Sequence, residues 1–269
     1  MKKLIVLGTG AANTLHYYNT CFMLQGPQGG LLVDGGGGNG ILVQLNKAGI
    51  PLTELTDLFV THEHIDHSLG VIWLVRMISS LFLREKRSDI FRIHCHARLA
   101  EKLRSICQFT LSEKQFSPVG TSIRFVPVKD GEQRSIAGHT VTFFNTHSRK
   151  AEQYGFHMQD PNGQRIVCTG DEPCQPVCAH YLEGADWLFH EAFCLESDAR
   201  IFRPHLIGHG TVREAALLAR KQRVKNIVLW HTEDSATLGT RKERYTEEAA
   251  SVFRGGIYIP DDLEEIELY

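Results

Sequence analysis

The sequence predicts an α/β protein in which two mixed sheets pack face to face and helices cover their outer surfaces. Strand patterns lead in each half of the chain, with helix patterns between them, and this order favours layered sheets over a bundle. The 269 residues are enough to bury a large core. The hydrophobic content of 42% and charged content of 22% are typical of a globular protein. We see no repeat or linker, so we expect one domain over residues 1–269.

Short apolar runs between glycines or other turn residues predict the strands. In chain order they are Leu4–Leu7, Thr20–Leu24, Leu31–Val33, Leu58–Val60, Phe91–His94, Ser122–Val128, Thr140–Asn145, Tyr154–Met158, Arg165–Cys168, Trp187–His190, Asn226–Trp230 and Gly256–Ile259. The glycine run Gly35–Gly38 lacks the spacing of a phosphate-binding loop or a dinucleotide fingerprint. We interpret it as a tight turn from a strand into a helix, close to the functional site.

Helical spacing of apolar residues predicts five longer helices. They are Gly40–Ala48, Asp66–Phe82, Arg98–Phe109, a helix that begins at Thr211, and Lys242–Phe253. The segment Leu69–Val75 is apolar on nearly all sides, which predicts that its helix is buried. Thr211 and Glu214 have the spacing of a capping box, in which each side chain bonds the backbone N–H near the other.

The charge and the cysteine content limit the kinds of partner and the cellular location that we expect. The net charge is −2, and the short basic clusters fall on predicted helix faces, so charge does not argue for nucleic acid. None of the seven cysteines forms a C-x-x-C pair, and reduced thiols fit a cytoplasmic protein. The first apolar run is too short for a signal peptide, and no stretch predicts a membrane span. We therefore expect no membrane partner.

A dense set of metal-ligand residues follows the predicted strand Leu58–Val60. His62 and His64 alternate in one direction at the strand end, so both can reach one ion. If the chain then turns into a helix, Asp66 and His67 face a second position beside the first. Nitrogen and oxygen ligands of this kind suit zinc, and manganese or iron less well. Loop histidines are often ordinary surface residues, but four ligand-type residues at this spacing favour a metal site.

Three further ligand-type residues each follow a predicted strand. They are His147, Asp171 and His231. Strand ends converge on one rim of an α/β fold, where loops build sites, so we expect these side chains to meet the first four. Each of them taken singly could be structural. His94 and His96 also alternate on a strand, and we interpret those two as structural.

With these residues in place, the sequence resembles the metallo-β-lactamase superfamily, whose H-x-H-x-D-H motif matches residues 62–67. The resemblance implies a four-layer αβ/βα sandwich with two metal ions between the sheets. It implies that the first ion is held by His62, His64 and His147, the second by Asp66, His67 and His231, and that Asp171 bridges them.

Three further segments are similar to the ribonuclease Z branch of that superfamily. They are Tyr154-Gly-Phe156, His190-Glu-Ala192 followed by Phe193 in place of Thr, and His209-Gly-Thr211 with Gly210 in place of Ser. In that branch the Glu and the later His assist phosphodiester cleavage, which corresponds here to Glu191 and His209.

The residues around His209 support the same role independently. His209 lies two residues before the cap of a helix, whose N-terminus attracts anions. We expect Glu191 to orient the His209 ring and raise its pKa, so that His209 can protonate a leaving group. The alternative is that His209 merely precedes the helix without a catalytic role and that Glu191 is an ordinary surface residue.

One departure from the ribonuclease Z pattern concerns the long Gly/Pro-rich arm that holds the body of tRNA. In bacterial members the arm lies between the third and fourth metal motifs. Here His147 and Asp171 are only 24 positions apart, and two strands and a turn already occupy that interval. The resemblance is therefore to armless phosphodiesterases, which act on small or cyclic phosphodiesters.

The resulting hypothesis is a phosphodiesterase with two divalent metal ions, zinc first, that acts on small, cyclic or nucleotide phosphodiesters. Asp66 would be both a metal ligand and the group that orients the attacking water. A tRNA 3′-end endoribonuclease, for which the substrate is a nucleic-acid 3′ end, stays open as an alternative. So do a lactone or thioester hydrolase and a metal-dependent sensor. Relatives are often dimers, so a homodimer is also open.

Overall fold

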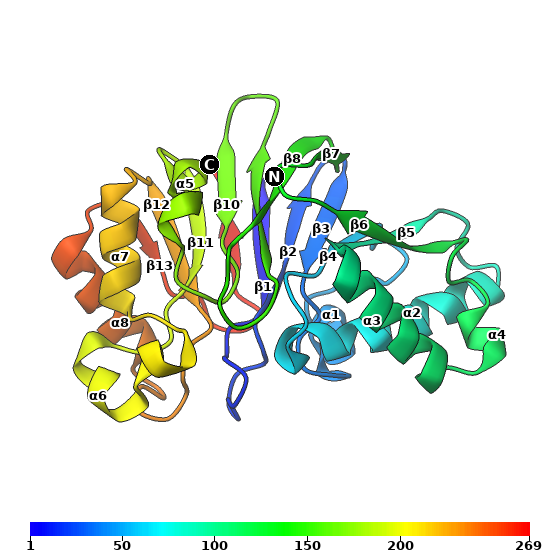
Figure 1. Cartoon of the computed structure of the whole chain (residues 1–269), viewed down its shortest axis with the longest axis horizontal. Coiled ribbons are helices and arrows are strands. Elements are labelled where there is room, and N and C mark those ends of the chain that lie inside the picture. Colours follow the sequence, from blue (N-terminus) through cyan, green and yellow to red (C-terminus); the bar gives the residue numbers. More distant parts are fainter.

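The computed structural model describes residues 1–269 and has two seven-stranded sheets packed face to face (Figure 1). Helices α1–α4 flank one sheet, and helices α5–α8 flank the other (Figure 1). The layers therefore run helix, sheet, sheet, helix, which is the predicted fold class. The order of layers follows from burial, because each sheet covers its inner face with the other sheet and its outer face with helices.

The first sheet has the strand order β14-β1-β2-β3-β4-β5-β6. Its strands are β1 (Lys3–Gly8), β2 (Cys21–Gly26), β3 (Gly29–Val33), β4 (Asp57–Phe59), β5 (Phe91–His96), β6 (Ile123–Val128) and β14 (Glu265–Glu267). Strands β3 to β6 are parallel, whereas β14, β1, β2 and β3 pair antiparallel.

The second sheet has the order β13-β12-β11-β10-β9-β8-β7. Its strands are β7 (Gln133–Ile136), β8 (His139–Asn145), β9 (Tyr154–Gln159), β10 (Arg165–Cys168), β11 (Trp187–Glu191), β12 (Asn226–Trp230) and β13 (Gly256–Tyr258). Strands β10 to β13 are parallel and β7 to β10 antiparallel, so this sheet is also mixed. Strands β8, β10, β11 and β12 consequently end at the same edge.

The longer helices are α1 (Gly40–Lys47), α2 (Ile65–Leu83), α3 (Ala97–Thr110), α7 (Val212–Lys221) and α8 (Arg241–Val252). The short helices are α4 (Glu113–Phe116), α5 (Ala179–Leu182), α6 (Ala199–Phe202) and the 3₁₀ turns η1 (Pro176–Cys178), η2 (Glu196–Asp198) and η3 (Pro204–Ile207). Thr211 caps α7 in the predicted capping box with Glu214. By length and composition alone helix α2 could cross a membrane, a property it shares with core helices of soluble proteins, and half of that stretch is buried in the fold.

Aromatic residues fill the layer between the two sheets. Phe22 of β2 stacks on Trp230 of β12 with ring centroids 4.6 Å apart, and Phe59 of β4 meets Phe143 of β8 at 5.0 Å. Separate apolar layers lie between each sheet and its own helices. Burying such large rings fixes the two sheets against each other. The sheet edges that carry the ligand residues are thereby held at a constant separation.

Every predicted strand and longer helix is present, with ends shifted by a few residues. The sequence patterns missed β7, β14 and the short helices α4, α5 and α6. Strand β7 contains Gln133, Arg134 and Ser135, which are polar and partly exposed, and β14 is three residues long with glutamates at both ends. Edge strands of this kind have little apolar periodicity to detect, because they bury one face or none.

The glycine run after β3 is a turn into α1, as predicted, and it packs directly against the start of α2. Gly35 N–H donates to the carbonyl of His67 at 2.8 Å, and Gly70 N–H donates to the carbonyl of Gly36 at 2.9 Å. A Cβ added to Gly70 would lie 1.8 Å from the Gly35 carbonyl oxygen. Gly70 therefore permits the close approach that positions the first turn of α2.

Replacing Gly70 by alanine should lower the free energy of unfolding. Within a helix this change ordinarily stabilises by about 1 kcal/mol. Here the clash with Gly35 forces the turn away from α2, and overpacking of this kind costs about 1–3 kcal/mol or more. Chemical denaturation of Gly70→Ala beside the half-buried control Ser80→Ala on the same helix measures the difference. A Gly70→Ala protein as stable as the wild type would contradict the close packing.

Candidate metal centre

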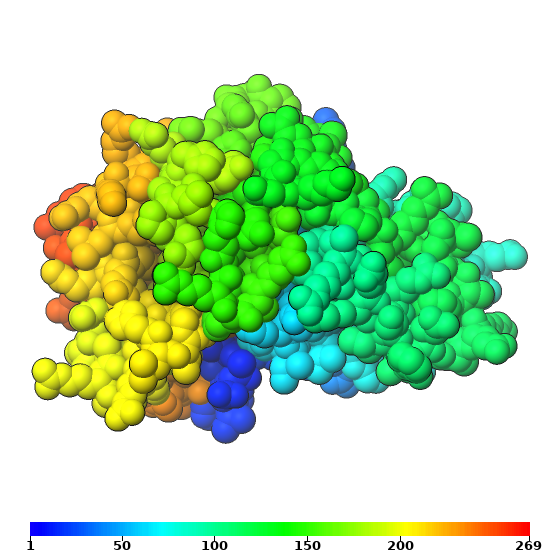
Figure 2. All heavy atoms as spheres, in the orientation of Figure 1, coloured from blue at the N-terminus to red at the C-terminus, as the bar shows by residue number.

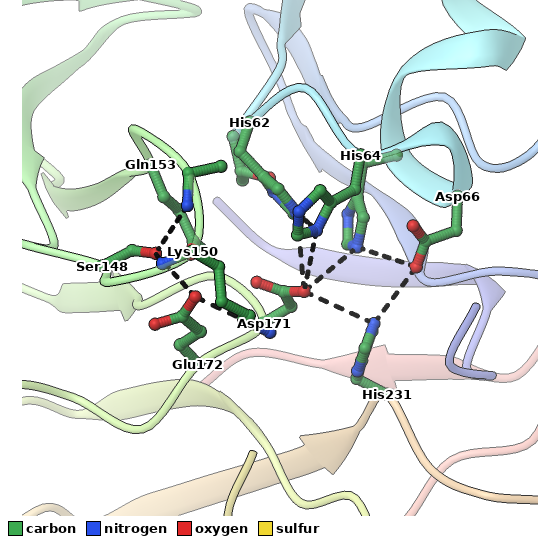
Figure 3. A network of polar contacts seen from close by, with 12 residues as sticks. His62, His64, Asp66, Ser148, Lys150, Gln153, Asp171, Glu172 and His231 are labelled. Atoms are coloured by element: carbon green, nitrogen blue, oxygen red, sulfur yellow. Dashed lines mark hydrogen bonds and ion pairs between the residues drawn. The ribbon is translucent and has the colours of Figure 1, made fainter. Parts of the chain in front are cut away.

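The metal-ligand residues converge from both sheets onto one edge of the sandwich (Figure 3). His62 and His64 lie in the loop after β4, and Asp66 and His67 lie in the first turn of α2. Asp171 and His231 come from the loops after β10 and β12 and face them from the other sheet. Figure 3 shows His62, His64 and Asp66 pointing toward Asp171 and His231.

The first ligand group consists of His62, His64 and Asp171, whose ligand atoms lie within 4.8 Å of one another. His62 Nε2 is 2.9 Å from His64 Nδ1 and 3.5 Å from Asp171 Oδ2. The His62 and Asp171 side chains are buried, whereas His64 is 38% exposed. This group is therefore open to solvent on the side of His64.

The second ligand group consists of Asp66, His67 and His231, all of them buried. Asp66 Oδ2 lies 3.3 Å from His67 Nε2 and 3.4 Å from His231 Nε2. Asp171 Oδ2 lies 3.8 Å from each of the same two nitrogens and also faces the first group. Asp171 thus stands between the two groups, where a bridging ligand is expected.

Asp34, at the end of β3, supports both groups through hydrogen bonds. His67 Nδ1–H donates to Asp34 Oδ2 at 2.7 Å, which leaves the Nε2 lone pair facing Asp66. Thr61 Oγ1 also donates to Asp34 Oδ2 at 2.8 Å and therefore accepts the His62 Nδ1–H at 2.9 Å. His62 Nε2 is left free in the same way. A carboxylate behind a ligating histidine fixes its tautomer and ring orientation.

The residues fit a divalent cation. His67 Nε2 and Asp171 Oδ1 are buried and have no hydrogen-bond partner. Burial favours neutral carboxyls, yet the neighbouring histidines keep the pKa of Asp66 and of Asp171 below its ordinary value. Burial also lowers the pKa of His64 and of His231, which favours the neutral, ligating imidazole. Asp34 and Asp66 by contrast raise the pKa of His67 despite its burial, so a cation bound there would displace its proton. Carboxylate oxygens and imidazole nitrogens together are the ligand set of a divalent metal site.

The structure does not bring His147 into either group. Its side chain is exposed, its φ is 55°, and its backbone N–H donates to Asn145 Oδ1 at 2.7 Å. His209, which was not predicted as a ligand, instead joins a third cluster with Asp171 and His231. His94 bonds Asp57 at 2.8 Å and His96 caps α3, so both serve the scaffold as predicted.

His209 and Glu191 lie side by side behind the ligand groups. Glu191 is fully buried, accepts the Gly210 N–H at 2.7 Å, and has its pKa raised by burial to about 7. Its Oε2 is 3.7 Å from His209 Nδ1, too far for a hydrogen bond. The expectation that Glu191 raises the pKa of His209 is wrong. Burial lowers that pKa against the effect of Asp171, and the charge of Lys150 lowers it further.

The loop after β8 adds charged residues that the sequence patterns did not single out. Lys150 Nζ lies 3.4 Å from His209 Nε2 and 3.6 Å from Glu172 Oε1. Ser148 Oγ donates to Glu172 Oε1 at 2.6 Å and accepts the N–H groups of Lys150 and Ala151. The only sequence signal for these contacts is proximity to His147 and Asp171, because the partners are distant along the chain.

A cavity of about 570 Å³ borders His209 on the outer side. Its walls include Leu15, Phe193, Phe202 and Ile207. Phe193 stacks on the His209 ring, with centroids 5.2 Å apart and planes at 20°. Figure 2 shows the dark-blue loop near residue 15 beside the yellow segment near residue 205, which form the two sides of this cavity.

This fold and these ligand groups define a metal-dependent hydrolase of the metallo-β-lactamase fold, similar to ribonuclease Z, with a divalent-metal site at the sheet edge. The chain belongs to the family described as Anti-Pycsar protein Apyc1, whose pattern matches residues 2–245.

Curated relatives of the chain are named ribonuclease Z. The protein from Bradyrhizobium sp. (strain ORS 278) is 25% identical, over 86% of this chain and 89% of its own length. The protein from Gemmatimonas aurantiaca is 29% identical, over 86% and 85%. The protein from Archaeoglobus fulgidus is 24% identical, over 99% and 97%, in an alignment of 317 positions. Since this alignment is longer than the 269 residues of the chain, that relative has residues that the chain lacks.

Solved structures share the fold. The metallo-β-lactamase fold protein YhfI from Bacillus subtilis superposes with a TM-score of 0.78 at 21% identity, over 99% of both chains. The short form of human tRNase Z gives 0.74 at 22% identity, also over 99% of both chains. A diphosphatase from the PhnP family gives 0.74 at 17% identity, over 100% of this chain and 98% of the other.

Removing the Asp34 carboxylate should weaken metal binding about 10- to 100-fold, as expected for loss of a group that orients ligating histidines. Metal titration of Asp34→Ala followed by metal analysis measures the loss. The matched control is Asp57→Ala, because Asp57 is also buried and bonds His94 at a similar distance, away from the site. The assignment would be contradicted if the two variants kept the same metal affinity.

Proposed function

We propose that the chain hydrolyses small, cyclic or nucleotide phosphodiesters with the aid of two divalent metal ions, zinc being the first candidate. The observation that carries this proposal is the pair of ligand groups sharing Asp171, with His209 and Lys150 beside them. Two adjacent cation positions suit a phosphodiester, because its charge needs neutralisation on more than one oxygen. The free thiols of all seven cysteines favour a cytoplasmic location.

The proposed metal ligands are His62, His64 and Asp171 for the first ion, and Asp66, His67 and His231 for the second. Asp171 would also reach the second ion, because its Oδ2 lies 3.8 Å from His67 Nε2 and from His231 Nε2. His147 would complete the first position if its loop turned inward. When bound, the ions would lower the pKa of the attacking water and neutralise phosphate oxygens. Zinc is favoured because imidazole nitrogens predominate among the ligands.

The chain's own residues would then position the reactants. Asp66, held in ionised form by His67 and His231, would accept a hydrogen bond from the attacking water and orient it toward phosphorus. His209 would hold the leaving oxygen and share in its protonation. Glu191, buried behind His209 and bonded to Gly210 N–H, would limit the movement of that ring.

Two features of the molecule favour a small substrate. The interval between His147 and Asp171 forms only the hairpin β9–β10, so no arm is inserted there (Figure 1). The cavity beside His209 has aromatic and aliphatic walls, which suit the organic group of a small diester. Asp234 closes one side of that cavity, because its Oδ2 accepts the backbone N–H groups of Leu15 and His16 at 2.5 and 2.6 Å.

The second candidate is cleavage of a nucleic acid at the 3′ end of tRNA. The curated relatives named ribonuclease Z and the fold shared with human tRNase Z favour it. A panel of bis(p-nitrophenyl) phosphate, cyclic mononucleotides, dinucleotides and precursor tRNA separates the candidates. Turnover of cyclic or dinucleotide diesters supports the proposal. Cleavage of precursor tRNA at low enzyme concentration, without turnover of small diesters, would replace it with the second candidate.

Replacing Asp66 by alanine should reduce hydrolysis of bis(p-nitrophenyl) phosphate by at least about 10²–10³-fold, since it removes a ligand and a positioning group together. Initial rates at saturating metal give the comparison. Glu63→Ala is the matched control, because Glu63 belongs to the same loop but pairs with Lys102. Wild-type turnover by Asp66→Ala would rule out this mechanism.

A further inference from the structure

Lys150 places a positive charge against Nε2 of His209, whereas the other ring nitrogen, Nδ1, is the one nearest Glu191. Its Nζ lies 3.4 Å from His209 Nε2. An ammonium group has no lone pair, so this contact requires Lys150 to donate and His209 Nε2 to accept. An oxygen seated against Nε2 would therefore lie within hydrogen-bond reach of Lys150 as well.

The residues around Lys150 leave space for its side chain, and none of the neighbouring carboxylates forms a hydrogen bond with its ammonium group. A Cβ on Gly208, which has φ 73°, would meet Lys150 Cε at 2.9 Å, so the glycine makes space for the lysine stem. Glu172 Oε1 is 3.6 Å from Nζ, beyond hydrogen-bond distance, and already accepts from Ser148 Oγ at 2.6 Å. Glu172 thus attracts Lys150 without holding it.

Lys150 is more than the exposed partner of a surface ion pair with Glu172. Its side chain is 26% exposed, whereas Glu172 is 7% exposed. The ammonium is therefore partly withdrawn from water toward His209, and a partly desolvated charge interacts more strongly with an incoming anion. Arg149, the preceding residue, is exposed, as Lys150 is when the whole residue is counted, and it therefore offers a matched comparison.

We propose that Lys150 is a catalytic residue that contacts the leaving-group oxygen of the phosphodiester, a role that rests on the function proposed above. In the reaction, the water oxygen forms a bond to phosphorus and the bond from phosphorus to the leaving oxygen breaks. The leaving oxygen takes one proton from the His209–Lys150 pair, the attacking water releases one proton to solvent, and the pair regains one proton from solvent. Lys150 stabilises the negative charge that develops on that oxygen.

The test is a series of methyl aryl phosphates whose phenol leaving groups differ in pKa, hydrolysed by the wild type, Lys150→Met, Lys150→Arg and Arg149→Met. Lys150→Met should lower kcat/KM by about 10²–10³-fold for the poorest leaving groups and much less for p-nitrophenolate. Lys150→Arg should restore part of the loss, and Arg149→Met should match the wild type. Equal losses across the series, or a Lys150→Met protein that behaves like Arg149→Met, would overturn the proposal.

A binding measurement gives an independent readout. Calorimetric titration of the metal-loaded protein with inorganic phosphate should show about tenfold weaker binding for Lys150→Met and unchanged binding for Arg149→Met. Metal content and the thermal unfolding midpoint check that the variants are folded, and Lys150→Gln replaces Lys150→Met if the latter unfolds. If the wild type hydrolyses no aryl diester, the proposed function fails. The phosphate titration then still decides whether Lys150 binds the anion, and unchanged affinity would reject it.

Discussion

The metal centre depends on one carboxylate, that of Asp34. Its Oδ2 accepts hydrogen bonds from His67 Nδ1 and from Thr61 Oγ1, and Thr61 in turn accepts from His62 Nδ1. The carboxylate therefore determines which nitrogen is free on one histidine of each ligand group. Its Oδ1 also accepts the Thr61 N–H, which fixes the strand end from which the ligand loop departs. The same carboxylate therefore orients the ligating histidines and fixes the backbone of the ligand loop.

The two-sheet architecture supplies the rest of the site. The aromatic layer between the sheets holds the β4 end opposite the ends of β10 and β12, so Asp171 and His231 meet ligands from a distant part of the chain. Several residues at this edge adopt left-handed backbone conformations. Asp34, His147 and His231 have φ of 60°, 55° and 57°. Such conformations cost about 1–2 kcal/mol each in non-glycine residues, a cost commonly found at functional sites.

The sequence was sufficient for the architecture and for most of the ligand groups, because both depend on local patterns. Apolar runs mark buried strands, and the spacing from His62 to His67 is set by one strand end and one helical turn. Asp34, Lys150 and Glu172 could not be recognised in this way. Their partners lie far away in sequence, and only the folded sheets bring Asp34 to His67 or Lys150 to His209.

The conformation of His147 and the charge state of His209 also lay beyond the sequence. The first depends on the backbone of a loop, and the second on burial and on a lysine from another loop. The strand before His147 and the helix after His209 were nevertheless predicted correctly. Loop geometry and long-range electrostatics, rather than secondary structure, therefore separate the family fold from the particular chemistry of this chain.

The most direct test of the account is the initial rate of bis(p-nitrophenyl) phosphate hydrolysis, measured as zinc or manganese is added back to chelated protein. The account predicts negligible turnover without metal, a rise with added metal, and a plateau near two equivalents per chain. A plateau near one equivalent would contradict the pair of ion positions that share Asp171. A rate that does not respond to metal would contradict the metal-dependent mechanism altogether.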